Sequence, residues 1–129
     1  MSIAAVDIVG LGMATVDVMT LIPRLPGRDE VFRAGSIILQ GGGPVATALV
    51  TAARLGASTA YVGPIAATTW GQLARAGLVE GGVDTNWAPR DAGGEQTVSV
   101  ILVDQNSGKR SILYDSGKME DLSPLDVPA

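Results

Sequence analysis

A run of three glycines followed by proline, at positions 41–44, separates two segments of opposite character. The segment at 30–39 starts with roughly alternating polar and apolar residues, which predicts an extended strand. The segment at 45–55 is rich in alanine, leucine and valine and is long enough for three helical turns. Pro44 suits the first turn of this helix, and Gly56 is the expected terminator. The run therefore predicts a strand that passes directly into a helix.

Extended and helical segments alternate along the rest of the chain. Strands are predicted at 6–12 and 58–63, and a helix is predicted from Thr68 or Thr69 to about residue 80. This alternation is typical of an α/β fold with parallel crossovers.

Four extended runs depart from that alternation. The runs at 97–104 and 109–115 flank Asn106-Ser107-Gly108, which predicts a hairpin. The runs at 15–22 and 30–39 have no helix between them, so we expect an antiparallel pair that stands outside the main sheet.

Composition excludes several classes of function. The 129 residues suit one domain and contain neither histidine nor cysteine, which excludes Ser-His-Asp hydrolysis, thiolate chemistry and nearly every zinc site. The net charge of −4 argues against nucleic acid or a membrane surface as a partner. Neither a secretory signal nor a membrane span is found, so a cytoplasmic protein is expected.

Two nucleotide-binding motifs are incomplete. Gly10-Leu11-Gly12 follows a predicted strand, but Thr15 takes the third glycine position of the dinucleotide fingerprint and no helix follows. A glycine-lined strand end explains this motif better than an oxidoreductase site. Gly108-Lys109 and Gly117-Lys118 lack the other residues of a Walker loop.

Two features could bind a polyol, and each has a simpler explanation. The backbone N–H groups of Gly41, Gly42 and Gly43 are open to a polar ligand near a helix N-terminus, but the glycines could equally form a flexible turn. The Asp17 carboxylate could accept two hydroxyl hydrogen bonds, or could simply be an exposed residue on an edge strand.

Taken together, these blocks resemble the N-terminal part of a ribokinase-like (PfkB-type) carbohydrate kinase. The blocks occur in the family's order and spacing, and they cover nearly the whole chain. They are Asp7-Ile8-Val9-Gly10-Leu11-Gly12 with Asp17, Leu25-Pro26-Gly27, Gly41 to Ala48, Ala53 to Ala57, Val62-Gly63 through Trp70-Gly71, Gly81 to Thr85, and the hairpin that ends in Asp115.

The resemblance implies an α/β sandwich with a small β-lid that often forms a dimer contact. It also implies transfer of the ATP γ-phosphoryl group to a sugar hydroxyl, helped by Mg²⁺. Asp17 would bind sugar hydroxyls, the backbone of Gly41 to Gly43 would line the sugar site, and Thr15 and Ser99 are further candidate contacts. No catalytic residue and no metal ligand is expected in this chain.

Three departures from the family pattern matter. Ala46 stands where the signature has asparagine, and Ala66-Ala67 stands where the family has glycine-aspartate, so Thr68 is expected to take over part of the capping role. The glycine-alanine-glycine-aspartate motif that carries the catalytic aspartate is missing, and Asp84 is only a poor imitation. Residues 1–129 are therefore expected to be the sugar-binding and lid half, without the ATP-binding half.

Two functions from different classes remain. One is a sugar kinase represented by its acceptor half, which is expected to be inactive alone. The other is a non-catalytic sugar-binding or oligomerisation module. Because an incomplete sheet exposes an edge and an apolar face, we expect the chain to self-associate, with the lid strands as one route.

Overall fold

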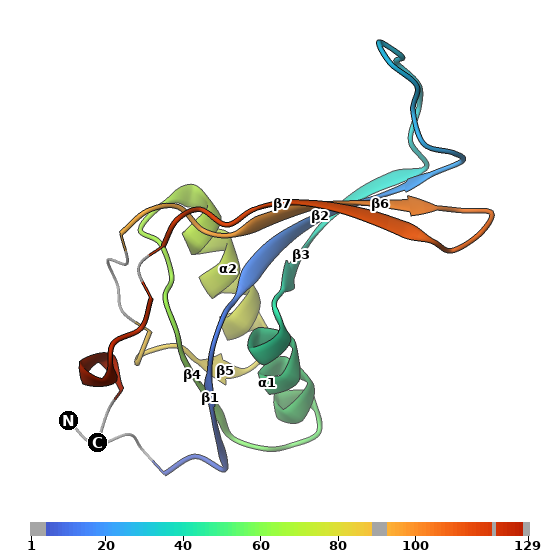
Figure 1. Cartoon of the computed structure of the whole chain (residues 1–129). Helices are drawn as coiled ribbons and strands as arrows, with labels where there is room; N and C mark the ends of the chain where they lie inside the picture. Colours follow the sequence, from blue (N-terminus) through green and yellow to red (C-terminus); the bar gives the residue numbers. More distant parts are fainter. Residues whose placement is uncertain (1–4, 89–92, 120, 128–129) are drawn as a thin grey trace.

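The computed structural model describes residues 5–88, 93–119 and 121–127, which form two sheets and two helices (Figure 1). One sheet belongs to a compact body and the other extends away from it as an arm. The elements in chain order are β1 (Ile8–Leu11), β2 (Thr15–Ile22), β3 (Ser36–Gly42), α1 (Pro44–Arg54), β4 (Thr59–Val62), α2 (Thr69–Glu80), β5 (Val83–Asp84), β6 (Val98–Asp104), β7 (Arg110–Asp115) and a short 3₁₀ turn (Pro124–Asp126).

The small sheet of the body has the strand order β1-β4-β5, and both of its pairings are parallel. Its central strand β4 is buried at all four positions, as a strand covered on both faces must be. Leu49 of α1 and Leu78 of α2 join Tyr61 of β4 in the core cluster. The predicted α/β class with parallel crossovers is confirmed.

Both helices begin where the sequence predicts, and their N-terminal caps differ. Thr68 caps α2, because its side-chain oxygen accepts a hydrogen bond of 3.3 Å from the Gly71 backbone N–H. The cap of α1 is Gly43, which has a φ of 95° and no side chain to offer. No side chain therefore caps the N-terminus of α1 by a hydrogen bond.

The arm is a four-stranded sheet of order β3-β2-β6-β7, which we call the lid. β2 pairs antiparallel with β3, as expected, and its other edge pairs parallel with β6 of the predicted hairpin. The lid thus has four strands, two more than the pair that was expected to stand apart.

The second lid strand begins later than predicted. The sequence indicated 30–39, whereas β3 covers Ser36–Gly42 and residues 30–35 belong to a loop. In this loop, Glu30 is tied to Arg24, whose guanidinium also lies 5.1 Å from the centre of the Phe32 ring. These side-chain contacts stabilise a loop where the alternating pattern predicted a strand. At its other end β3 extends beyond the prediction and includes Gly41 and Gly42.

A buried glutamine joins the lid to the body. Gln96 is 1% exposed, its Oε1 accepts from the Ala66 backbone N–H at 3.0 Å, and its Nε2 donates to the Ala14 carbonyl at 2.6 Å. Ala14 immediately precedes β2, so this side chain fixes the point where the lid leaves the body.

The substitution Gln96→Leu is expected to lower the free energy of unfolding by about 2–4 kcal/mol, because it leaves a buried N–H and a buried carbonyl unpaired. Urea unfolding followed by circular dichroism measures the change. Gln72→Leu, on the exposed surface of α2, is the matched control and should change stability little. Equal stability of the two variants would contradict the assigned role of Gln96.

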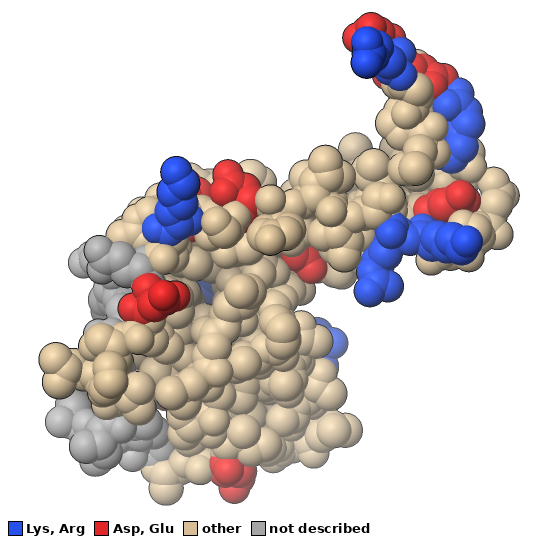
Figure 2. Space-filling view, in the orientation of Figure 1, with Lys and Arg blue, Asp and Glu red and all other residues tan. Residues whose placement is uncertain are grey.

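The charged side chains of the lid gather at its far end, as Figure 2 shows. There the hydrogen bond from Arg24, followed by that from the Gly27 backbone N–H, lowers the pKa of Glu30 to about 2. The carboxylate form of Glu30 therefore fastens the loop at every pH above its ordinary pKa of 4.5, and the contact is lost as the pH falls through about 2.

A carboxyl titration followed by NMR is expected to give Glu30 a midpoint near 2, and Arg24→Gln should return that midpoint toward 4.5. A midpoint near 4.5 in the unmodified protein would show that the Arg24 contact does not form in solution.

Across the described residues, no helix has the length and apolar character needed to cross a bilayer.

Candidate sugar-binding site

The candidate site lies where the lid leaves the body, above the uncapped N-terminus of α1 (Figure 1). β1 ends at Leu11, and after three residues β2 begins with Thr15. On the neighbouring strand, β3 ends at Gly42 and the chain enters α1 through Gly43. Because β2 and β3 are antiparallel, Asp17 near the start of β2 lies beside the glycines at the end of β3.

The register of the strands brings the predicted residues together. Thr15 pairs with Gly42, and Asp17 pairs with Gln40 on one side and with Ser99 on the other. Paired residues, and residues two apart on one strand, share a face of a sheet. Asp17, Thr15, Ser99 and Gln40 therefore lie on the same face of the lid.

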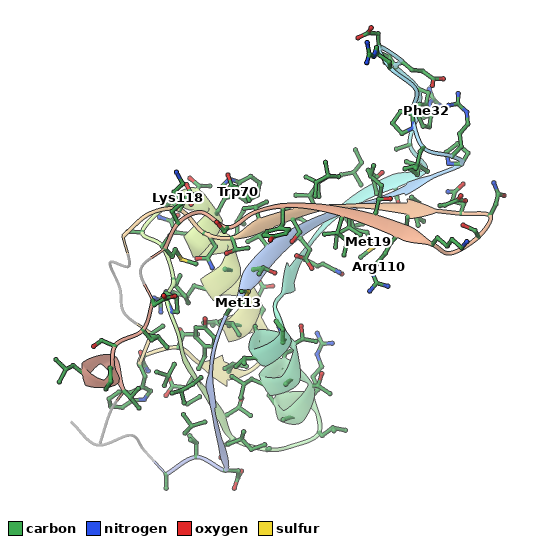
Figure 3. All side chains as sticks on the ribbon, viewed as in Figure 1. Met13, Met19, Phe32, Trp70, Arg110 and Lys118 are labelled. Carbon is green, nitrogen blue, oxygen red and sulfur yellow. The ribbon has the colours of Figure 1, made fainter. Side chains whose placement is uncertain are left out.

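The alternation along β2 also puts Met19 on this face. Figure 3 shows Met19 projecting from the lid toward the side on which α1 lies, together with Arg110 of β7. The face that carries Asp17 is therefore the underside of the lid.

Asp17 packs against Gly42 in the space that the Cβ of any other residue would occupy. A Cβ added at Gly42 would lie 2.6 Å from the Thr15 Oγ1 and even closer to the Asp17 Oδ2, which is nearer than real Cβ atoms approach. A methyl group at this position would push the carboxylate from where it lies. Gly42 thus packs against Asp17 and Thr15, and Gly41 and Gly42 belong to β3 and not to a flexible turn.

The Asp17 carboxylate is held from one side. Thr15 donates its hydroxyl hydrogen to Asp17 Oδ1 at 3.0 Å, and no hydrogen bond to Oδ2 is found within the described part of the chain. The Asp17 side chain is half-buried, whereas Thr15 is 6% exposed. An oriented carboxylate with an open oxygen can accept hydrogen bonds from hydroxyl groups of a ligand.

Gly43 and Gly41 play different parts. The positive φ of Gly43 turns the chain into α1, and a Cβ there would lie 2.6 Å from the Met13 carbonyl oxygen. Gly41 faces open space, with no atom within 4 Å of where its Cβ would be. Among the three glycines, Gly43 is therefore needed for its backbone conformation, Gly42 packs against side chains of the site, and Gly41 has no close neighbour.

The departures from the family pattern also have structural outcomes. Ala46 is 6% exposed and belongs to the core cluster, and Thr68 replaces the missing carboxylate as the cap of α2. Asp84 is used locally, since its Oδ1 accepts from the Asn86 backbone N–H at 2.9 Å. Thr68 and Asp84 have these local roles, whereas Ala46 lines the same cavity as Thr15 and Gly42.

Two residues of this region were not predicted from the sequence. Gln40 enters through its register with Asp17, and Gln96 positions the start of β2 through the Ala14 carbonyl. The β-pairing would have identified Gln40 once the end of β3 was known. No local pattern marks Gln96, because both of its partners are distant in the chain.

Fold and site together define an α/β protein of the ribokinase-like class, with a β-lid above the N-terminus of a helix. The pfkB family carbohydrate kinase model matches residues 5–128. The chain belongs to the pfkB family of carbohydrate kinases.

Individual relatives agree with this assignment. Mouse (Mus musculus) ketohexokinase is 24% identical over 120 residues, which are 93% of this chain and 40% of that protein. Among solved structures, Arabidopsis thaliana ribokinase complexed with ribose and ATP has a TM-score of 0.72 at 25% identity and covers 87% of this chain and 36% of its own. Fructokinase from Xylella fastidiosa has a TM-score of 0.68 at 23% identity, over 89% of this chain and 34% of its own. This chain therefore spans well under half the length of these relatives.

Proposed function

We propose that this protein takes part in ATP-dependent phosphorylation of a sugar hydroxyl, and that the described residues form the acceptor side of the reaction. The observation that carries the proposal is the Asp17 carboxylate, seated against Gly42 and oriented by Thr15 beneath the lid. A carboxylate with an open oxygen suits the adjacent hydroxyls of a sugar.

In this proposal, Asp17 accepts hydrogen bonds from two sugar hydroxyls, and Thr15 keeps the carboxylate in position. Ser99 contacts the sugar from β6, and the backbone of Gly41 to Gly43 lines the ring at the start of α1. The lid excludes water from the acceptor hydroxyl, which favours transfer to the sugar over hydrolysis.

The proposal places neither ATP nor Mg²⁺ on the described residues, because the sequence lacks both a Walker loop and the family's catalytic motif. The proposal assigns the nucleotide, the Mg²⁺ and the general base to residues outside this chain, and it places the reaction in the cytoplasm.

Two measurements test the proposal. Calorimetry with ketoses, aldopentoses and nucleosides should reveal one preferred sugar class for the 129-residue chain, and a coupled assay of ADP formation should detect no turnover by this chain alone. Turnover by the chain alone would contradict the assignment of the base and nucleotide site elsewhere. If no sugar binds, the acceptor role of Asp17 is wrong.

The alternative function is a non-catalytic sugar-binding or oligomerisation module, and the outer face of the lid supports self-association in either case. Because side chains alternate along a strand, the outer face carries a row of apolar residues opposite the site. Three of them are 42–59% exposed: Leu39, Val100 and Leu113. We propose that a second copy of the chain covers this row.

Light scattering coupled to size-exclusion chromatography is expected to give a dimer or larger species, and Val100→Glu should shift it toward the monomer. The charge would otherwise be buried without a partner. Thr69→Glu, on the exposed start of α2, is the control and should leave the assembly unchanged. A monomeric unmodified chain would contradict the proposed contact.

A further inference from the structure

A cavity lies between the two helices and adjoins the candidate sugar site. It has a volume of about 260 Å³ and is covered by the last residues of β3. Its wall includes Thr15, Gln40, Gly41 and Gly42 of the candidate sugar site, but Asp17 and Ser99 do not line it. We call this cavity the interhelical groove.

The groove has one polar side and one apolar side. Thr47, Thr51 and Arg54 line it from α1, at positions four and three residues apart that fall on one face of the helix. Ala74 and Leu78 line it from α2 and are both 2% exposed. A ligand in the groove would therefore meet the polar groups of α1 together with apolar surface from Val50, Ala74 and Leu78.

Two glycines keep the groove open without a steric need for glycine. A Cβ on Gly77 of α2 would have as its nearest atom the Gly41 Cα, at 3.8 Å, and a Cβ on Gly41 would meet nothing within 4 Å. Alanine would fit at both positions. At position 77 it would also stabilise the interior of α2. The chain thus leaves volume here that ordinary helix packing would fill, and that volume is lined by an arginine.

Arg54 supplies the charge of the groove. Its side chain is exposed, and no ion pair or hydrogen bond of its guanidinium is found within the described ranges. The Thr51 hydroxyl is already used, because it donates to the Thr47 carbonyl at 2.8 Å. The Thr47 hydroxyl and the guanidinium remain as donors, and a planar guanidinium matches a carboxylate by two parallel hydrogen bonds.

We propose that the interhelical groove binds a small monocarboxylate with a short unbranched apolar tail. The carboxylate lies against Arg54 and Thr47, and the tail lies between Val50 and Leu78 and extends toward Gly77. A single cation and an apolar wall suit this ligand better than inorganic phosphate, which needs more donors. The site does not depend on the sugar-kinase function.

Calorimetry with acetate, butanoate and hexanoate tests the proposal on the purified protein. Each added methylene is expected to tighten binding about fourfold until the groove is full. Butan-1-ol and hexan-1-ol, which lack the carboxylate, should bind at least about tenfold more weakly. Equal affinity for all three acids, no binding of any of them, or tighter binding of inorganic phosphate would overturn the proposal.

Three variants locate the binding. Arg54→Gln should weaken hexanoate binding about tenfold or more, and Arg54→Lys should weaken it less, while it keeps a positive charge at the end of α1. Gly77→Leu should abolish binding by filling the groove, and circular dichroism checks that α2 still forms. Arg110→Gln, on the lid, is the control. If Arg54→Gln and Arg110→Gln bind hexanoate equally, the groove is not the site.

Discussion

Replacing Asp17 by asparagine is expected to weaken sugar binding about 100-fold or more. Two hydrogen bonds from sugar hydroxyls to a carboxylate become bonds to a neutral amide, and the loss of about 3 kcal/mol corresponds to that factor. Asparagine has nearly the same shape as aspartate, so the stability of the lid should change little. Titration calorimetry with the preferred sugar measures the effect.

Asp115→Asn is the matched control, because Asp115 pairs with Val98 and so lies on the opposite face of the same sheet. It should bind sugar like the unmodified chain. If the Asp17→Asn variant still binds sugar at full strength, the carboxylate has no part in the proposed site, whatever the other residues do.

The pair Gly42→Ala and Gly41→Ala should behave in opposite ways. The new methyl group at position 42 meets the Asp17 carboxylate and the Thr15 hydroxyl, so the carboxylate must move from its place, and sugar binding should fall about 30-fold or more. The methyl group at position 41 enters open space, and binding should change less than about twofold.

Calorimetry and urea unfolding on both variants separate binding from folding. We expect Gly42→Ala to cost about 1–3 kcal/mol of stability, because the contact it forces is tighter than packing allows. If both alanine variants bind sugar normally, the close fit of Gly42 around Asp17 has no functional meaning.

Much of the fold could be predicted because its signals are local. Gly56 marks the C-terminal end of α1, and Thr68 marks the N-terminal start of α2. Each of these boundaries depends on a single residue beside the helix. The hairpin around Asn106 was equally clear, since tight turns depend on a few adjacent residues.

The lid could not be predicted as fully. The parallel pairing of β2 with β6 joins residues about 80 positions apart, and the start of β3 depends on side-chain contacts of the preceding loop. For the site, sequence reasoning proposed Asp17 and the glycines separately, and only the register between β2 and β3 showed that Gly42 fits around the carboxylate. Gln96 has no signal in the sequence, because its burial depends on two hydrogen-bond partners that are distant in the chain.

β2 begins where the lid leaves the body and runs along the lid, and Asp17 is its third residue. At about 3.3 Å per residue, Asp17 lies about 7 Å beyond Thr15, and Ile22 lies about 23 Å beyond it. If the strand tilts as a lever pivoted at Thr15, a swing of about 10° displaces Asp17 by only about 1 Å but Ile22 by about 4 Å. Such a tilt would move the tip of the lid several times farther than the carboxylate that is proposed to bind the sugar.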